Sequence, residues 1–258
     1  MTGFVDYTPP DEHGVAHALI AHPGKLNALD TAMWRALREV FSVQVPSTAP
    51  RVVVVRGDAG TFVAGGDIAE FPDFRFEAHT LARFHEALVA PALQAMLDCD
   101  VPLIAHIEGA CIGGGLEIAA CCDIRLCGQT SRFGVPIAKL GFPMAPAEVA
   151  IVARVVGPTV LRELLLEARV LTAKEAFERG LITRVLPDDG LAAEVAQVAN
   201  RMAQLSPQAM RLNKQVLREF GHGDAGTPGS RAPHYAYAPS AEHREGLAAF
   251  NEKRPARF

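Results

Sequence analysis

The longest apolar stretch of the chain, Val101–Cys122, constrains the fold more than any other segment. It is long enough to raise the question of a membrane-spanning helix. However, His106, Glu108 and Glu117 bring ionisable groups into this stretch. Three consecutive glycines, Gly113–Gly115, interrupt it as well. Because such features are unfavourable in lipid, we expect a buried strand, a glycine turn and a buried helix, with no membrane association.

Strand-like and helix-like patterns alternate along the first part of the chain. The β-branched run Arg51–Arg56 is typical of a strand that is covered on both faces. After residue 190 only helical patterns remain, at Leu191–Ala203, Pro207–Phe220 and Ala241–Asn251. Between the last two, Gly221–Pro239 is rich in glycine and proline and is predicted to be a loop. We therefore predict an α/β core over residues 1–190 and a helical region over residues 191–258.

Charge and cysteine content argue against several classes of protein. The net charge of the 258 residues is −4, which argues against nucleic acid as a partner because phosphate binding requires a basic surface. The five cysteines cannot all pair and contain no C-x-x-C motif, so neither a disulfide framework nor a zinc site is predicted. We expect reduced thiols and a cytoplasmic protein. The first residues also lack the basic start and apolar run of a signal peptide.

Two glycine clusters follow predicted strands, at Gly65–Gly66 and at Gly113–Gly115 before a helix. Glycine lets the backbone approach a ligand closely and leaves N–H groups free to point at it. A helix N-terminus adds the positive end of a dipole, which suits a negative oxygen. Neither cluster has the spacing of a dinucleotide or phosphate loop. Taken alone, each cluster is explained more simply as a tight turn.

Glu117 makes a functional interpretation of the second glycine cluster more favourable. It lies one turn into a predicted helix, Leu116–Cys122, whose other residues are all apolar. A helix that is apolar all round is buried, so its carboxylate is expected to be buried too. One interpretation is a glutamate that interacts with the helix dipole or pairs with a neighbour. The other is a general acid/base beside an anion-stabilising turn, with a pKa raised by desolvation.

Ordered motifs continue along most of the chain. They are Pro23–Leu29, Val52–Gly57, Phe62–Ile68, Gly109–Glu117, Asp123–Ile124, Phe133–Pro136, Leu140–Gly141, Leu171–Gly180, Ser206–Pro207 and Ser240–Arg254. Together they resemble the enoyl-CoA hydratase/isomerase (crotonase) family. The resemblance implies an α/β fold in which β-β-α units form nearly perpendicular sheets, followed by C-terminal helices that mediate trimer formation. It also implies an enzyme that acts on acyl-coenzyme A thioesters through an enolate.

The resemblance implies catalytic roles for three residues. The backbone N–H groups of Gly66 and Gly114 match the family's oxyanion hole, which holds the thioester oxygen as it gains charge. Glu117 matches the principal acid/base.

Further positions match substrate-binding ones: Lys25, Leu26, Ala64, Asp67, Ile68, Ile137, Phe250 and Lys253. The first three match positions at the coenzyme A nucleotide, and the last two match positions near its phosphate end. Ordinary solvation or packing explains these five residue types equally well. Asp67 also suits an aspartate that caps the following turn, and we favour that structural role.

The family pattern is broken at Ile137, where the two-glutamate hydratases carry their second glutamate. Addition of water to a double bond requires one group that handles the water and one that supplies a proton to the α-carbon. Glu117 therefore performs both tasks, another residue such as Glu148 substitutes, or the reaction differs. Glu148 is explained more simply as a glutamate in the first turn of a helix.

The leading prediction is thus an enoyl-CoA hydratase/isomerase family enzyme. It takes coenzyme A only as part of its acyl-CoA substrate, uses no metal or other cofactor, and assembles as a homotrimer or a dimer of trimers. One alternative is another reaction on the same fold, such as Δ3/Δ2 isomerisation or decarboxylation. A second alternative is a non-catalytic acyl-CoA- or RNA-binding protein. The retained glutamate and glycines, together with the acidic net charge, argue against this second alternative.

Overall fold

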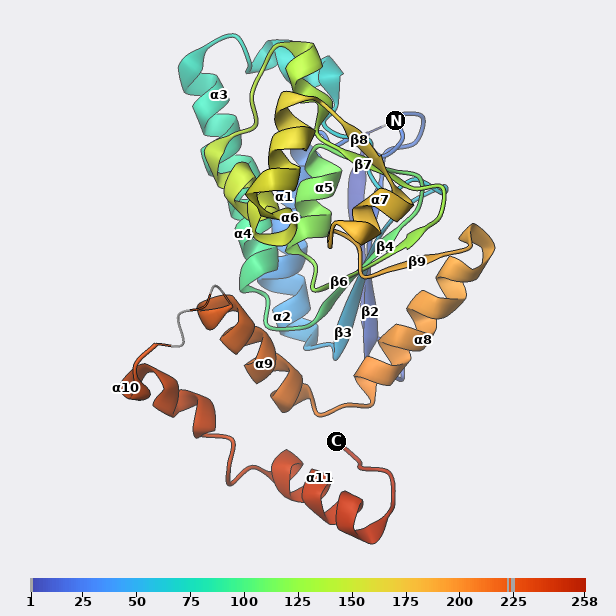
Figure 1. The fold of residues 1–258 in the computed structure, drawn as a ribbon, viewed down its shortest axis with the longest axis vertical. Coiled ribbons are helices and arrows are strands. Elements are labelled where there is room, and N and C mark those ends of the chain that lie inside the picture. The colour runs from blue at the N-terminus through green and yellow to red at the C-terminus, as the bar shows by residue number, and fades with distance from the viewer. Residues whose placement is uncertain (1, 222, 224–225) are drawn as a thin grey trace.

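The computed structural model describes residues 2–221, 223 and 226–258. Its larger sheet has six strands in the order β1-β2-β3-β4-β6-β9. The strands are β1 (Phe4–Thr8), β2 (Val15–Ala21), β3 (Val52–Gly57), β4 (Leu103–Ile107), β6 (Ile124–Gly128) and β9 (Arg184–Leu186). Only the β1–β2 pair is antiparallel, and the other neighbours in this sheet run parallel. Figure 1 shows this sheet between a group of helices on one face and α8 (Leu191–Ala203) on the other.

Alternate residues of the central strands face opposite layers. Val53 and Val55 of β3 join one buried cluster with α1 (Thr31–Glu39), α4 (Ala90–Asp98) and α5 (Gly114–Cys121). Val52 and Val54 of the same strand join a second cluster with α8 (Leu191–Ala203). The β-branched run is therefore covered on both faces, as the sequence predicts. The packed core continues through α8, beyond the change to purely helical structure at residue 190.

The smaller sheet contains three strands of three residues each, in the order β5-β7-β8. They are β5 (Ala110–Ile112), β7 (Arg132–Gly134) and β8 (Val170–Thr172). β5 pairs with β7 in parallel and β7 with β8 antiparallel. Because β5 ends directly before Gly113, this sheet fixes the start of α5.

Several further helices complete the fold. They are α2 (Val45–Thr48), α3 (Ala78–Phe84), α6 (Pro146–Leu166) and α7 (Ala173–Glu178), followed by α9 (Pro207–Phe220), α10 (Pro228–Arg231) and α11 (Ala241–Glu252). α6 is bent at Gly157, whose φ is 71°. π-helical turns join α1 to α2 and α3 to α4. Among the described residues, no helix is long and apolar enough to cross a membrane.

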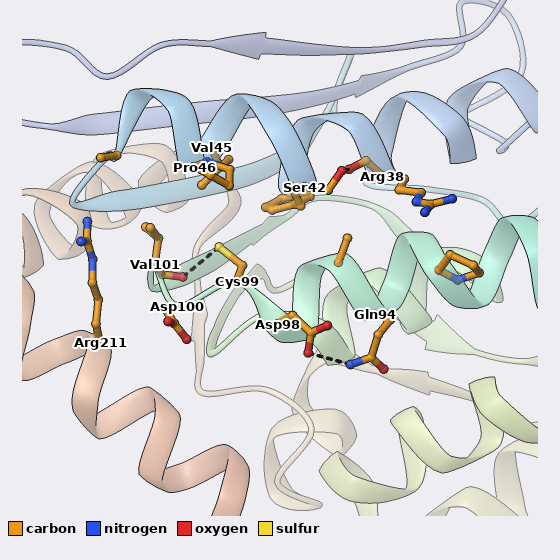
Figure 2. Close-up of a pocket in the computed structure, with 14 residues that line it drawn as sticks. Arg38, Ser42, Val45, Pro46, Gln94, Asp98, Cys99, Asp100, Val101 and Arg211 are labelled. Carbon is orange, nitrogen blue, oxygen red and sulfur yellow. Dashed lines mark hydrogen bonds between the residues drawn. The ribbon is translucent and has the colours of Figure 1, made fainter. Parts of the chain in front are cut away.

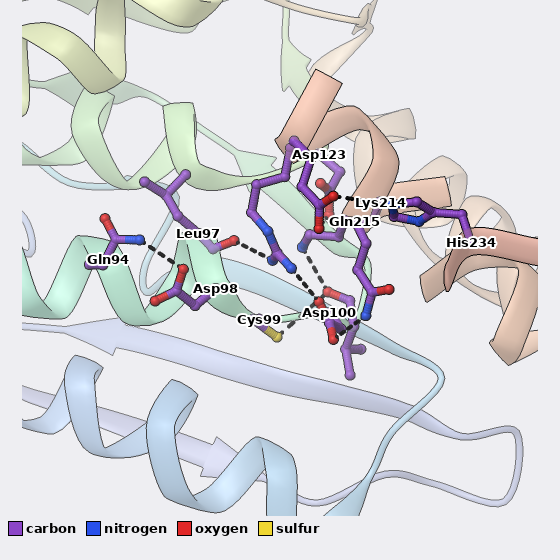
Figure 3. Close-up of polar contacts among 12 residues, drawn as sticks. Gln94, Leu97, Asp98, Cys99, Asp100, Asp123, Lys214, Gln215 and His234 are labelled. Carbon is purple, nitrogen blue, oxygen red and sulfur yellow. Dashed lines mark hydrogen bonds and ion pairs between the residues drawn. The ribbon is translucent and has the colours of Figure 1, made fainter. Parts of the chain in front are cut away.

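Helix α9 is attached to the core by ion pairs and hydrogen bonds (Figure 3). Lys214 forms an ion pair with Asp123 at 2.8 Å. Gln215 and Arg218 both donate to the carboxylate of Asp100, at 2.7 and 2.8 Å. Helices α10 and α11 extend farther from the sheet (Figure 1).

The segment Gly221–Pro239 is not a loop throughout, contrary to the prediction. It contains α10 and a 3₁₀-helix, Ala232–Tyr235, each of four residues. The side chain of Thr227 accepts a hydrogen bond from the Ser230 N–H and caps α10. Such short helices lack the periodicity that a sequence pattern needs. Residues 222, 224 and 225 of this segment lie outside the described residues.

The five cysteines are unpaired and buried. Burial raises the pKa of the Cys122 and Cys127 thiols to about 12. They act as small apolar residues of the core, as the sequence analysis expects.

Candidate active site

A cavity of about 340 Å³ lies where the two glycine turns meet the N-terminus of α5. Its walls also come from the 3₁₀-helices Ile68–Asp73 and Pro136–Leu140 and from the first turn of α6. Most of its lining is aliphatic or aromatic, as is usual for small-molecule sites. The predicted residues that line it are Ala64, Gly66, Ile68, Gly114, Glu117 and Ile137.

Backbone hydrogen bonds fix each glycine turn to a neighbouring segment, and the Ile112 N–H donates to the Val63 carbonyl at 2.9 Å just before the two turns. The Gly65 carbonyl accepts from the Leu29 N–H at 2.8 Å, and the Gly113 N–H donates to the Gly134 carbonyl at 2.9 Å. Gly113 has φ 52°, a conformation that strongly favours glycine. A Cβ on Gly115 would lie 2.6 Å from the Val63 carbonyl oxygen, so a larger residue cannot fit there without backbone movement.

Gly66 and Gly114 present free N–H donors at the cavity. Among the described residues, neither N–H has a hydrogen-bond acceptor. Gly114 is the first residue of α5, where an N–H has no partner inside the helix. The helix dipole adds a partial positive charge at the same point. This part of the cavity is suited to a negatively charged oxygen.

The Glu117 side chain is buried in the wall of the cavity and is only 6% exposed. Its carboxyl group makes no hydrogen bond with any described residue. Burial raises the pKa of Glu117 well above its usual value, the negative charge of Glu148 raises it further, and Arg75 opposes the shift. Glu117 therefore holds a proton more readily than an ordinary glutamate, which suits a group that transfers one.

Glu148 lies at the first turn of α6 and is 3% exposed. Its Oε1 is 2.6 Å from Nδ1 of His85, which belongs to the π-helical turn between α3 and α4. Both residues line the same cavity as Glu117. The cavity thus holds a second buried carboxylate, fixed by an imidazole.

Arg75 enters the cavity wall from the loop after the 3₁₀-helix Ile68–Asp73. Its guanidinium carbon lies 4.1 Å from the ring centre of Phe71 and 3.8 Å from that of Phe142. Burial lowers the pKa of Arg75, while Glu148 and Glu117 raise it. The cavity therefore contains a cation held between aromatic rings, as well as two carboxylates.

Of the residues predicted at the coenzyme A nucleotide, Ala64 lines the cavity, whereas Lys25 and Leu26 contact residues at its edge. Lys25 forms an ion pair with Asp67 at 2.5 Å, and the Ala64 N–H donates to the Leu26 carbonyl at 3.1 Å. Asp67 also accepts from the Ala69 N–H, which confirms its predicted capping role. Burial acts to raise the pKa of Asp67, but the hydrogen bonds from Lys25 and the Ala69 N–H lower it below its usual value.

Phe250 and Lys253 do not line the cavity. Both lie at the end of α11, which is far from α5 (Figure 1). The Phe250 side chain is 83% exposed.

A second, larger groove lies between the segment Arg38–Ala49 and α4 (Figure 2). It is lined by Ser42, Cys99, Asp100 and Arg211 among others. None of the predicted site residues, all of which are described, lines this groove. It also lacks a glycine turn at a helix N-terminus, so we assign the site to the cavity around Glu117.

Sequence reasoning missed His85, Arg75, Phe71 and Phe142. His85 contacts a residue 63 positions later, and nothing near it in sequence indicates this contact. Of the two rings closest to Arg75, Phe71 is near it in sequence but Phe142 is not, so the pair forms only after folding.

Comparison with known proteins finds similar sequences and a similar fold. The enoyl-CoA hydratase/isomerase family model matches residues 11–258. The Escherichia coli K12 protein named 2,3-dehydroadipyl-CoA hydratase is 31% identical over 239 residues, which cover 92% of this chain and 91% of that protein. Crotonyl-CoA hydratase of Syntrophomonas wolfei is 30% identical over 251 residues, covering 96% and 95%. The crystal structure of an enoyl-CoA hydratase/carnithine racemase from Magnetospirillum magneticum has a TM-score of 0.94 at 36% identity, covering 100% of this chain and 96% of that one. This solved structure confirms the predicted crotonase-like fold.

Proposed function

Because the chain belongs to the enoyl-CoA hydratase/isomerase family, we propose that it acts on the double bond of enoyl-CoA thioesters by stabilising an enolate. The observation that carries this proposal is the placement of Glu117, Gly66 and Gly114 around one cavity. No metal or redox cofactor takes part in the proposed reaction, and coenzyme A enters only with the substrate.

In this proposal the N–H groups of Gly66 and Gly114 donate to the thioester oxygen. The oxygen gains negative charge when the enolate forms, and both donors are already in place without a competing acceptor. Loss of one such donor reduces rate by about 10²–10³. Glu117 then transfers its proton to the α-carbon of the enolate, a role that its raised pKa supports.

Hydration needs a second group that takes a proton from water, and the proposal assigns this task to Glu148. Ile137 lines the cavity at the position of the missing glutamate and cannot exchange a proton. Glu148 is held by His85 at 2.6 Å in the same cavity. The water oxygen adds to the β-carbon, its proton passes to Glu148, and the proton of Glu117 passes to the α-carbon. A proton transfer from Glu148 to Glu117 then restores the resting state.

Double-bond isomerisation is the second candidate. It needs only one base to move a proton between the α- and γ-carbons, and Glu117 alone can serve. The apolar Ile137 in the cavity wall favours this candidate, because it leaves no proton-exchanging group at the position of the missing glutamate.

The test follows hydration of crotonyl-CoA separately from deuterium incorporation into a 3-enoyl-CoA in deuterated water. Glu117→Gln should abolish both reactions while leaving coenzyme A binding nearly unchanged. Glu148→Gln should slow hydration by roughly 10²–10⁴ and leave deuterium incorporation in place. Glu86→Gln is the matched control, because Glu86 is the exposed neighbour of His85 and should affect neither reaction.

The outcomes separate the candidates. Fast hydration that survives Glu117→Gln would contradict the enolate mechanism. Hydration that survives Glu148→Gln would leave Glu117 as the sole acid/base. Absence of hydration in the native protein, with rapid deuterium incorporation, would identify an isomerase.

We also propose that the protein assembles as trimers or paired trimers through its C-terminal helices. Leu217 of α9 is 71% exposed and Leu247 of α11 is 56% exposed, as unpartnered apolar side chains. Association through these helices would cover such residues. In this arrangement Phe250 and Lys253 contribute to the coenzyme A site of a neighbouring protomer.

A further inference from the structure

Arg75 is held in place by aromatic rings. Its guanidinium carbon is 4.1 Å from the centre of the Phe71 ring and 3.8 Å from that of Phe142. The two rings meet edge to face, with centres 5.8 Å apart. Cation–π contacts on two rings fix the plane and position of the guanidinium without using its N–H donors.

Among the described residues, those donors have no partner. Arg75 Nε is buried without a hydrogen-bond acceptor. Within the described part of the chain, the Arg75 side chain forms no ion pair either. Glu148, a buried carboxylate of the same cavity, is bonded to His85 instead. Arg75 as a whole is half-buried, but leaving its buried Nε donor unpaired is costly, so its place in a ligand cavity indicates that a ligand supplies an acceptor.

We propose that Arg75 binds a carboxylate on the acyl chain, so that the preferred substrates are enoyl-CoA thioesters of dicarboxylic acids. This inference rests on the proposed function, which places the thioester at Gly66 and Gly114. The guanidinium presents a planar fork of donors that matches a carboxylate in a bidentate geometry. Phe84, Val89 and Met144 line the same cavity and provide apolar surface for the methylene groups between the two ends.

The competing explanation is that Arg75 only balances the charges of Glu117 and Glu148. Burial lowers the pKa of Arg75, and the charges of Glu148 and Glu117 oppose this shift, as charge balance requires. The two explanations predict different dependence on the substrate. Charge balance affects all acyl chains alike, whereas carboxylate binding affects only chains that end in a carboxylate.

The experiment measures binding of unreactive saturated thioesters by titration calorimetry. Hexanoyl-CoA is compared with adipyl-CoA, which has the same chain length with a terminal carboxylate, and the series extends from butanoyl to octanoyl and the matching dicarboxylic thioesters. We expect the native protein to prefer a carboxylate-ended thioester by roughly 10- to 100-fold at one chain length. Arg75→Met should remove this preference and Arg75→Lys should retain part of it.

Arg83→Met is the matched control. Arg83 is exposed on α3 and lies outside the cavity, so this variant should keep the preference of the native protein. The proposal is overturned if the native protein shows no preference at any chain length, or if Arg75→Met weakens both kinds of thioester equally. Because the native protein is measured first, a variant that fails to fold does not remove the test.

Turnover is measured in parallel with unsaturated thioesters of the same series. If the native protein binds the carboxylate-ended chain preferentially but turns over none of them, the proposed reaction is wrong and the role of Arg75 stands. If it turns over methyl-ended and carboxylate-ended chains equally and binds them equally, the proposed reaction stands and the role of Arg75 is wrong.

Discussion

Two substitutions of Gly114 separate the role of its N–H from the space around its Cα. Alanine adds a Cβ and keeps the N–H, whereas proline adds a similar Cβ and removes the N–H. Gly114 is the first residue of α5, a position at which proline is compatible with the helix. The comparison of the two variants therefore isolates the oxyanion hydrogen bond.

The structure sets the expected magnitude for each variant. A Cβ on Gly114 would lie 2.8 Å from Cδ1 of Leu29 and 3.0 Å from Cζ2 of Trp34. The end of the leucine side chain can shift, but the indole is 3% exposed and has little room. Overpacking of this kind costs about 1–3 kcal/mol. A protein of this size loses roughly 2–4 °C of melting temperature for each kcal/mol, so both variants should melt several degrees below the native protein.

The two variants should differ more in activity than in melting temperature. Gly114→Ala keeps the donor and should lose activity only through the small displacement of the turn. Gly114→Pro should lose a further factor of about 10²–10³ in kcat/KM, which corresponds to about 3–4 kcal/mol of transition-state stabilisation. Melting followed by circular dichroism reports on folding, and kcat/KM for crotonyl-CoA reports on the reaction. A folded Gly114→Pro variant with the same kcat/KM as Gly114→Ala would refute the oxyanion assignment.

Three further predictions concern stability and assembly. The pKa of Glu117 is raised in the folded state, so the native state keeps a proton that the unfolded state loses, and the free energy of unfolding should fall as pH rises above the usual carboxyl value. Glu117→Gln lacks this dependence and should gain stability relative to the native protein as pH rises. Urea unfolding of both proteins across that pH range measures the difference. Equal pH dependence of the two unfolding free energies would contradict the prediction. Lys214→Met should lower the free energy of unfolding by about 1–2 kcal/mol, which thermal melting checks. It removes the 2.8 Å ion pair with the partly exposed Asp123 and a hydrogen bond to the Val101 carbonyl. Sedimentation at micromolar concentration should show trimers or hexamers, and a monomer would rule out assembly through α9 and α11.

The elements with strong periodicity could be predicted from the sequence. Helices α8 and α9 have the predicted bounds. Thr172 and Glu175 form a capping box, which their spacing in the sequence indicates. The strand β3 was recognisable because four consecutive valines have few other stable environments. Glu117 and the glycine turns could also be predicted, since an isolated carboxylate on an apolar helix is unusual at the level of sequence.

The other parts of the fold and of the site depend on contacts between segments that are distant in sequence. The strands β5, β7 and β8 are three residues long and show no alternation of their own. Glu148 has the sequence environment of an ordinary glutamate in a first helical turn, and only its contact with His85 gives it a distinct role. The unpaired state of Arg75 is likewise a property of the folded cavity.

The buried thiols allow the opening of the core to be followed chemically. The thiolate is the form that alkylating reagents attack, and burial raises the pKa of all five cysteines. Under native conditions, modification should therefore follow the rate at which local structure opens. Cys99 is the most exposed at 8% and directly precedes Asp100, to which α9 is attached. Cys111 is fully buried between the two sheets and the helical layer. Mass spectrometry of pulse-labelled protein should thus show Cys99 modified when α9 detaches, and Cys111 only when the whole domain unfolds.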